Sequence, residues 1–202
     1  MRARDGLVPL EGNRASPLAT ACRSTLLVAS LGSIEGRGHR AAYERNIPPS
    51  QLHAITAAVA GVWLPMDLGL AHYRACDALG LTLGEQLELG AEVVKRTTQS
   101  LMGTVLIAAR ATGAVSVWSM LDKFGQVYAR NFQGGGAAVT RKGPKDARID
   151  VVGLPLAQVP YFRAAYLGSL RAAVDLFAQR AVVTEIRAAC SETTLGFQAA
   201  WV

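Results

Sequence analysis

The sequence predicts an α/β (α+β) fold, in which a helical N-terminal two-thirds packs against a C-terminal β-β-α-β-β unit. Apolar residues recur at helical spacing through the middle of the chain, whereas they alternate with polar residues near its end. Hydrophobic residues make up 50% of the 202 residues but aromatic residues only 6%, which favours closely packed helices over an aromatic-rich sandwich. The length suits a single domain at residues 16–202, preceded by a loose tail at residues 1–15.

The beginning of the chain gives the weakest pattern. Residues 24–31 could form a strand or a short helix, and residues 33–40 indicate a loop. Two consecutive prolines then precede Ser50, whose residue type often caps helices. We therefore expect a helix from Ser50 to about Val59, as the first clear element of a helical part at about residues 50–132.

Longer helices are expected over about residues 67–79, 82–110 and 115–132. Gly80 suits the end of the first, because glycine adopts the left-handed conformation that often follows a helix. The second opens with Thr82 and Glu85 at the spacing of a capping box, in which each side chain satisfies a backbone N–H group of the other residue.

The sheet part is expected over about residues 137–202. Two segments with β-like character flank Gly143-Pro144 and predict a hairpin. The rest of the unit is a helix followed by two strands with alternating apolar residues, expected at about residues 161–179, 182–188 and 195–201.

Three consecutive glycines, Gly134–Gly136, precede several basic residues and raise the question of a phosphate-binding loop. Such loops run from a strand into the N-terminus of a helix, whereas here a helix precedes the glycines and a strand follows. The sequence also contains neither GxxxxGK[S/T] nor GxGxxG. We therefore interpret the glycines as the end of a helix and the turn into the hairpin.

Four basic residues, Arg141, Lys142, Lys145 and Arg148, are expected around the hairpin tip. They form either a solvated edge that resists aggregation or a contact surface for an acidic protein partner. The net charge of +6 and the pI of about 9.6 allow an anionic partner. Because no dense run of Lys and Arg with interleaved aromatic residues occurs, we expect no nucleic-acid partner.

His72 and Cys76 lie four residues apart on an expected helix, so both could face one site. No third ligand lies nearby, which favours a half-exposed histidine and a buried cysteine over a metal site. A Cys–His nucleophile pair would need an orienting group that the sequence does not identify. We therefore expect no metal and no catalytic residue, and keep a Cys/His enzyme as the weaker alternative.

Localisation follows from the cysteines and from the distribution of apolar residues. Cys22, Cys76 and Cys190 are far apart, are odd in number and form no CxxC motif, which favours a reducing cytoplasm over a disulfide framework. No run of about twenty uncharged apolar residues is present, so we expect no membrane span. The apolar residues 18–31 are interrupted by Arg23 and lack a cleavage site, so we expect no signal peptide.

Trp63, Trp118 and Trp201 are the largest side chains of an alanine-rich sequence, and tryptophans lie more often in cores than in sites. Small-molecule pockets are mostly apolar, with a few polar groups. If the chain binds an apolar small molecule, we expect Trp63, Trp118 and Tyr128 to contact it.

Several short motifs resemble a known family. Trp63-Leu64-Pro65 precedes a helix that ends in Ala-Leu-Gly, and LGEQLELGAE opens the long helix. The helix PYFRAAYLGSLRAAVDLFA and the strand FQAAW belong to the terminal β-β-α-β-β unit. Over about residues 30–202 the chain resembles a paralogous family expanded in myxobacteria. That family is similar to the haem-nitric-oxide/TRAPP-like superfamily, which includes four-vinyl-reductase-type small-molecule-binding domains.

The resemblance implies an α/β domain for ligand binding or assembly, often dimeric. Haem-binding members carry a proximal histidine and a Tyr-x-Ser-x-Arg motif, and this motif is absent here, as are the metal-binding cysteines of some relatives. We therefore expect no cofactor. The resulting hypothesis is a cytoplasmic, non-enzymatic sensory module that binds an apolar small molecule and signals to a protein partner or a second copy. The alternative is a protein-interaction scaffold with a filled core and no ligand.

Overall fold

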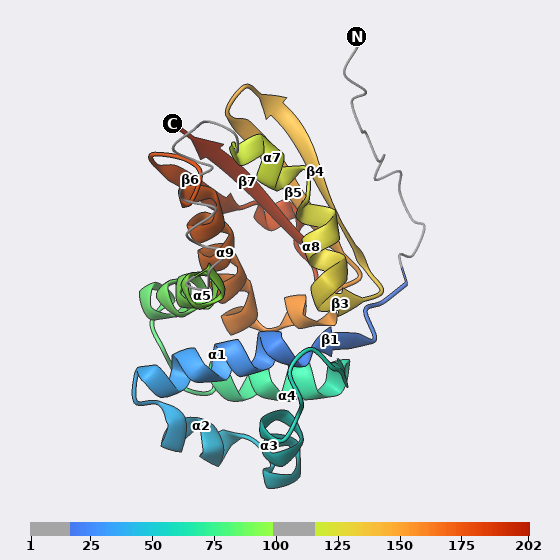
Figure 1. Cartoon of the computed structure of the whole chain (residues 1–202), viewed down its shortest axis with the longest axis vertical. Helices are drawn as coiled ribbons and strands as arrows, with labels where there is room; N and C mark the ends of the chain where they lie inside the picture. The colour runs from blue at the N-terminus through green and yellow to red at the C-terminus, as the bar shows by residue number, and fades with distance from the viewer. Residues whose placement is uncertain (1–16, 99–115) are drawn as a thin grey trace.

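The computed structural model describes residues 17–98 and 116–202. It contains a helical part, a small sheet beside it, and a larger antiparallel sheet with helices on one face (Figure 1). This arrangement confirms the predicted α+β fold class. The expected loose tail at residues 1–15, and the end of the helix expected to continue to about residue 110, lie outside the described residues.

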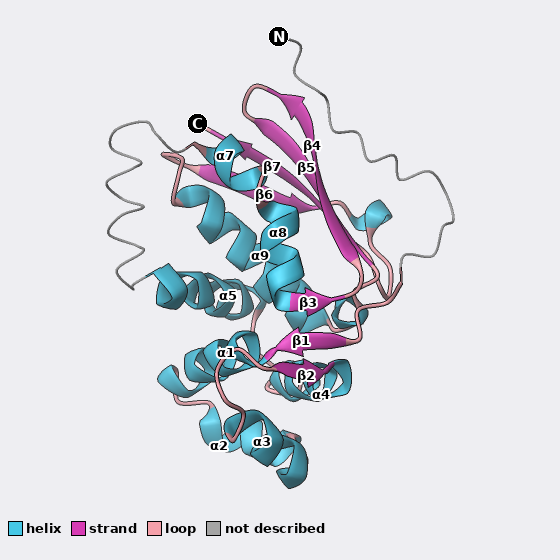
Figure 2. Cartoon of the chain, turned by 45° about the vertical axis from the view of Figure 1, so that its right-hand side comes forward, coloured by secondary structure: helices cyan, strands magenta, loops and turns pink. Residues whose placement is uncertain are grey.

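Four helices build the helical part. Helix α1 (Ser24–Gly36) lies beside α4 (Met66–Asp77), and α2 (Arg40–Asn46) and α3 (Pro49–Thr56) pack against this pair (Figures 1 and 2). Among the described residues, no helix combines the length and apolar character needed to cross a bilayer.

Three details of this part differ from the expectations. The segment at residues 24–31 is a helix and continues through much of the expected loop, because Leu27, Leu31 and Ile34 form a buried stripe at helical spacing. Helix α2 also occupies residues from the end of that loop onward. Helix α3 begins at Pro49, and its cap residue Pro48 makes no side-chain cap hydrogen bond, so the expected capping role of Ser50 was wrong. A proline fits there because the first helical turn needs no N–H donor.

A small antiparallel sheet joins the helical part to the rest of the molecule. Its strand order is β2 (Trp63–Pro65), β1 (Ala21–Arg23) and β3 (Phe132–Gln133), as Figure 2 shows. Gly61 and Pro65 on either side of Trp63 predict a turn, but the Trp63–Pro65 segment is a strand. Strand β1 is central, with Cys22 opposite Leu64 on one side and Phe132 on the other.

Helix α5 (Leu83–Thr98) packs closely against α9 (Pro160–Asp175). Its predicted capping box is confirmed: Glu85 accepts a hydrogen bond from the Thr82 backbone N–H at 2.8 Å, and Thr82 Oγ1 accepts one from the Glu85 N–H at 3.3 Å. Gly90 and Gly168 lie at the crossing, and a Cβ atom on either would overlap the backbone of the facing helix. The two glycines therefore allow the helix backbones to touch.

The larger sheet has the strand order β4 (Gly136–Gly143), β5 (Asp146–Val152), β7 (Leu195–Trp201) and β6 (Ala181–Glu185), with every neighbouring pair antiparallel. Short 3₁₀ turns, η1 (Pro155–Gln158) and η2 (Arg187–Ala189), lie between the elements. The predicted hairpin, helix and two strands are confirmed. The alternation of apolar and polar residues predicted these strands because only one face of the sheet is deeply buried.

The helix expected at residues 115–132 is divided into α7 (Val117–Leu121) and α8 (Phe124–Asn131). The intervening turn allows Trp118 to reach Trp201 while Phe124 remains buried. After α8 and β3, Gly134 and Gly135 have φ values of +88° and +66°, a backbone conformation that glycine adopts readily. The glycines thus turn the chain into the hairpin, as interpreted from the sequence.

Candidate functional site

An apolar cavity of about 400 Å³ lies between the helices. Figure 1 shows α5 and α9 on one side of this region, α7 and α8 on the other, and α1 next to both. None of the lining residues that the structure describes carries a formal charge. They are Thr25, Leu26, Ala29, Val93, Val94, Met120, Leu121, Phe124, Val127, Tyr128, Asn131, Phe132, Phe162, Tyr166, Ser169, Leu170, Ala173, Val174, Leu176 and Phe177.

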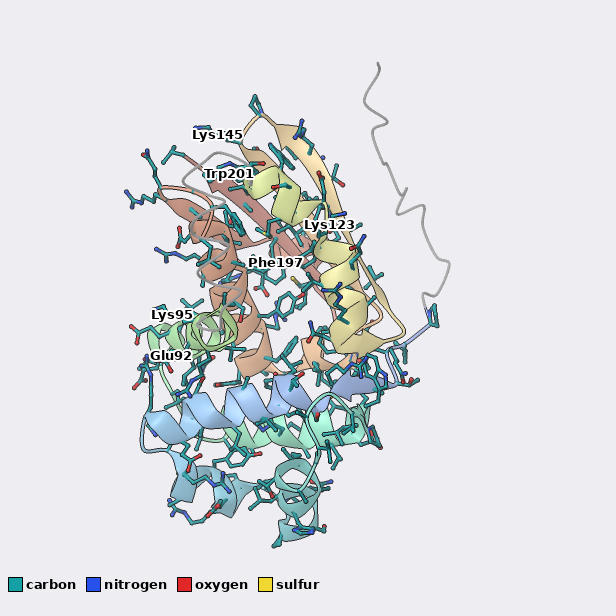
Figure 3. The ribbon with its side chains drawn as sticks, viewed as in Figure 1. Glu92, Lys95, Lys123, Lys145, Phe197 and Trp201 are labelled. Atoms are coloured by element: carbon teal, nitrogen blue, oxygen red, sulfur yellow. The ribbon has the colours of Figure 1, made fainter. Side chains whose placement is uncertain are left out.

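The sheet explains why the helices stand apart. Tyr166 of α9 stacks on Phe197 with ring centroids 5.9 Å apart, and Trp118 of α7 packs on Trp201 at 5.0 Å. Phe197 and Trp201 point to the same face of β7, because residues four apart on a strand share a face. Figure 3 shows Phe197 between α8 and α9, and Trp201 nearer the hairpin end. The cavity therefore lies between two helical segments that cover one face of the sheet.

Most polar groups in the cavity wall bond to the backbone. The Tyr128 hydroxyl donates to the Gly134 carbonyl at 3.2 Å, and Ser169 Oγ lies 2.8 Å from the Gly90 carbonyl oxygen. Asn131 Nδ2 donates to the Val127 carbonyl at 2.8 Å. Burial raises the pKa of Tyr128 to about 12 and also raises the pKa of Tyr166. Both phenols therefore remain uncharged at neutral pH.

A second buried region lies among α1, α2 and α4. His72 Nδ1 is 2.8 Å from the Tyr43 hydroxyl, and His72 Nε2 is 2.9 Å from Ser30 Oγ. Cys76 Sγ lies 3.8 Å from the same Nε2. We call Ser30, Tyr43, His72 and Cys76 the His72 cluster. All four side chains are buried, so the expected half exposure of His72 was wrong, whereas the expected burial of Cys76 is confirmed.

Burial also decides the charges of the His72 cluster. It lowers the pKa of His72 to about 3 and raises the pKa of the Cys76 thiol, so imidazole and thiol are both neutral. A thiolate–imidazolium pair is disfavoured at such a site. Both imidazole nitrogens already have hydroxyl partners, and the pair lies in the core rather than in a cleft.

The three residues expected to contact a ligand have different positions. Tyr128 lines the cavity, but Trp63 and Trp118 are not among its lining residues. The Arg23 guanidinium lies 3.7 Å from the ring centroid of Trp63, and the Arg141 guanidinium lies 3.9 Å from that of Trp118. Each tryptophan thus contacts an arginine and does not line the cavity. Such contacts are favourable, because a cation is attracted to the face of an aromatic ring.

Aromatic residues of α9 and of the turn that follows it were missed as site residues. Phe162, Tyr166 and Phe177 line the cavity. Phe162 and Tyr166 are four residues apart on a helix, so they share a face, and this spacing was the available signal. It was not decisive, because the same pattern is typical of core helices.

The hairpin brings together the four basic residues expected there, with different surroundings. Arg148 binds the Asp150 carboxylate through two nitrogens at 2.9–3.0 Å, and Arg141 stacks on Trp118. Lys142 and Lys145 are exposed near the tip, where Figure 3 labels Lys145. A partner-binding role of the hairpin stays a prediction.

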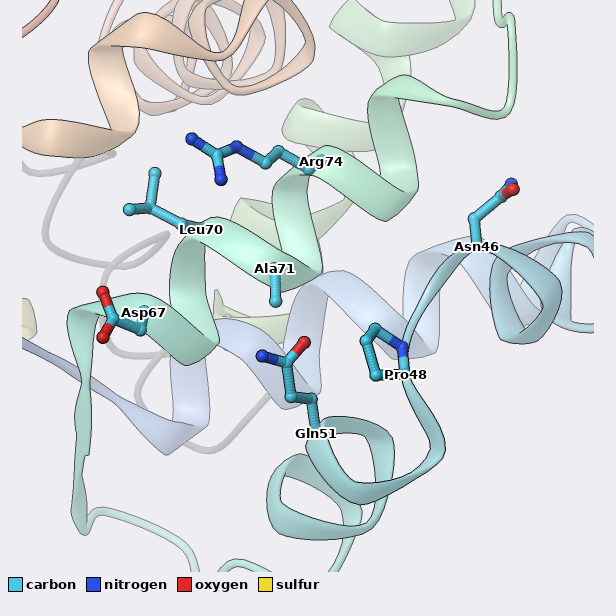
Figure 4. Close-up of a pocket in the computed structure, with 7 residues that line it drawn as sticks. All are labelled: Asn46, Pro48, Gln51, Asp67, Leu70, Ala71 and Arg74. Carbon is cyan, nitrogen blue, oxygen red and sulfur yellow. The ribbon is translucent and has the colours of Figure 1, made fainter.

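A shallow groove of about 470 Å³ lies on the surface between α4 and the α2–α3 connection (Figure 4). Its Arg74 side chain already donates to Gln158 Oε1 at 3.0 Å. The groove is open and mostly polar, so it offers less burial to a small molecule than the apolar cavity. Its lining residues are Asn46, Pro48, Gln51, Asp67, Leu70, Ala71 and Arg74.

No protein-family model and no curated protein sequence matches the chain. Solved structures do match. The Fe(II) unliganded H-NOX protein from K. algicida is 12% identical with a TM-score of 0.64, and the match covers 89% of this chain and 96% of that chain. The chain has the H-NOX fold. A structure from work on heme distortion in the H-NOX family is 10% identical with a TM-score of 0.58, over 89% of this chain and 94% of the other. The resemblance to the haem-nitric-oxide superfamily is thus confirmed at the level of fold.

The H-NOX fold raises the question of whether this cavity suits a haem. Haem iron is held by His, Cys thiolate, Met with His, or Tyr. The sequence has three histidines: His39 precedes α2, His53 is exposed on α3, and His72 belongs to the buried cluster. None of them lines the cavity, and neither does any cysteine.

The tyrosines of the cavity and the partners that it offers to the propionates also suit a haem poorly. Tyr128 and Tyr166 have raised pKa values, which disfavour the phenolate that would bind iron. The two propionate carboxylates of a haem need cationic or polar partners, and no described lining residue is basic. The described residues that line this cavity therefore do not fit a haem.

Proposed function

We propose that this chain is a non-enzymatic sensory module, which binds an apolar small molecule in the cavity and signals its occupancy to a protein partner. One observation carries the proposal: the described residues that line the cavity of about 400 Å³ are uncharged and predominantly apolar. Small-molecule sites typically occupy about 300–1,000 Å³ and are mostly apolar. The H-NOX structures of similar fold are described with heme or Fe(II), which gives a precedent for a bound group within this fold.

The cavity favours this proposal over a scaffold with a filled core. A packed protein interior leaves few voids larger than a water molecule. An unoccupied apolar cavity of this size would also lower stability, because its lining atoms lack van der Waals partners. A bound apolar molecule would supply those contacts.

Helix α7 offers a route from the cavity to a partner. Met120 and Leu121 line the cavity, while Trp118 of the same short helix donates its indole N–H to the Pro144 carbonyl at 2.7 Å. Pro144 lies at the hairpin tip, between the exposed Lys142 and Lys145. A ligand that shifts α7 would therefore shift the tip, where an acidic partner could distinguish the two states.

The non-enzymatic part of the proposal rests on the His72 cluster. Its imidazole and thiol are buried, neutral and outside the cavity. A nucleophile needs access to substrate and an activated form, and this pair has neither. The cluster instead fits a structural role between α1, α2 and α4.

Native mass spectrometry and an absorption spectrum of the freshly purified full chain test the proposal. We expect a retained small organic mass and no haem absorption band. The variant Ala173→Phe would fill part of the cavity from α9 and should lose this mass. Its control is Ala172→Phe, because Ala172 lies on the same helix but does not line the cavity.

Thermal unfolding in the presence of diphenylmethane provides a second readout. Binding to the folded state stabilises it by RT ln(1 + [L]/Kd), about 2.7 kcal/mol at a free concentration of 100 Kd. We expect stabilisation of the wild type and of Ala172→Phe, and much less for Ala173→Phe. A bare mass together with no stabilisation by the probe would contradict ligand binding and support the scaffold alternative.

A further inference from the structure

Tyr166 differs from the other hydroxyl-bearing residues deep in the cavity wall. Its ring is held between Phe162 and Phe197, with centroid distances of 5.4 Å and 5.9 Å. Tyr128 and Ser169 donate their hydroxyl protons to backbone carbonyls. The Tyr166 hydroxyl, in contrast, has no hydrogen-bond partner among the residues that the structure describes.

The Tyr166 hydroxyl must face open space. Among the described residues, every side-chain nitrogen or oxygen that is sealed from solvent has a hydrogen-bond partner. An unpartnered hydroxyl is therefore not sealed, and Tyr166 is half-buried with its exposed part in the cavity wall. A hydroxyl that is accessible from the cavity and has no described protein partner can donate its proton to an acceptor on a bound molecule.

The same surroundings define which occupant fits. A charged ligand would lose its hydration without gaining a counter-charge, because none of the described lining residues is charged. Burial raises the pKa of Tyr166, so the phenol keeps its proton and can donate it. Thr25 and Asn131 also line the cavity, but Thr25 is exposed, and Asn131 already donates its side-chain N–H to the Val127 carbonyl.

We infer that the cavity takes an uncharged, largely apolar molecule with a carbonyl oxygen, and that Tyr166 donates its O–H to that oxygen. The inference rests on the proposed ligand-binding function and adds the chemical class of the ligand and the residue that recognises it. The apolar body would contact the walls from α1, α5, α8 and α9. The single hydrogen bond would fix its orientation.

The matched probes benzophenone and diphenylmethane test this inference, because they differ chiefly in the presence of the carbonyl group. Binding of each is measured by calorimetry to wild type, Tyr166→Phe and Tyr128→Phe. Tyr166→Phe should weaken benzophenone binding about threefold to tenfold, the range of a single hydrogen bond. It should leave diphenylmethane binding within about twofold.

Tyr128→Phe is the matched control, because the Tyr128 hydroxyl proton is already donated to Gly134. It should affect both probes equally. If Tyr166→Phe changes the affinity for neither probe, or for both equally, the carbonyl inference is overturned while the ligand-binding function stands. If neither probe binds the folded wild type, the inference and the proposed function both fail. Near-ultraviolet circular dichroism verifies that each variant is folded.

Discussion

Helix α1 contributes to two regions that differ in how their polar groups are satisfied. Its Ser30 joins the His72 cluster, where both imidazole nitrogens have hydroxyl partners. Its Leu26 and Ala29 line the cavity, in which the Tyr166 hydroxyl has no partner among the described residues. The cluster is complete without a ligand, whereas the cavity is not.

The contrast shows that a polar residue indicates a site only when its hydrogen bonds are incomplete. His72 and Cys76 have the side chains most often used in catalysis, yet their surroundings hold them neutral and buried. Tyr166 carries only an uncharged phenol, but the fold leaves its hydroxyl free of described protein partners and able to bond to a ligand. Hydrogen-bond satisfaction therefore separates a structural polar group from a binding group.

The largest expected effect on stability comes from disrupting the His72 cluster. His72→Leu would leave the buried hydroxyls of Tyr43 and Ser30 without their partner. Each of the two unsatisfied groups costs about 1–3 kcal/mol, so the free energy of unfolding should fall by roughly 2–6 kcal/mol. Urea unfolding measures this change. His53→Leu is the control, because His53 is exposed, and a similarly small effect for both variants would contradict a structural role of His72.

The second effect is a pH dependence of the free energy of unfolding that the buried His72 should produce. The pKa of His72 is about 3 in the folded protein, against 6.5 as its ordinary value. Between these values the unfolded chain binds a proton that the folded chain does not, so stability falls as pH drops below about 6.5. The slope approaches about 1.4 kcal/mol per pH unit.

Unfolding of wild type and His72→Gln between pH 7 and pH 4.5 measures this contribution. The two stability curves should converge as pH falls, because the variant lacks the titrating group. His53→Gln is the matched control, because it removes an exposed histidine rather than a buried one. Parallel curves for His72→Gln would show that His72 is not held neutral by the fold.

Elements with a regular pattern and a clear end were predictable from the sequence. The hairpin and β7 alternate over several residues, and the capping box of Thr82 and Glu85 marks the start of α5. The strands β1 and β2 have three residues each, which is too short for a period to be recognised. The break between α7 and α8 was missed because tertiary contacts of Trp118 determine it.

The site was less predictable than the fold. Tyr128 could be named from the sequence, but the arginines that contact Trp63 and Trp118 are distant in the chain and come close only in the folded molecule. The availability of the Tyr166 hydroxyl is also a property of its surroundings. No pattern of residue types shows which hydroxyl lacks a partner.

The smallest expected effect is also the most direct comparison of the two regions. Tyr43→Phe and Tyr166→Phe each remove one phenolic hydroxyl. The first deletes a hydrogen bond to His72 and should lower the free energy of unfolding by about 1–2 kcal/mol. The second deletes a hydroxyl without a described protein partner, so in ligand-free protein it should change stability by less than about 0.5 kcal/mol.

Urea unfolding of both variants, after removal of any bound small molecule, measures the difference. Adding benzophenone should then affect the two variants differently: it should stabilise Tyr43→Phe as much as wild type, but stabilise Tyr166→Phe less. A large loss for ligand-free Tyr166→Phe would mean that its hydroxyl is already satisfied within the protein. The cavity would then resemble the His72 cluster, and the recognition of a ligand would have to come from its apolar walls alone.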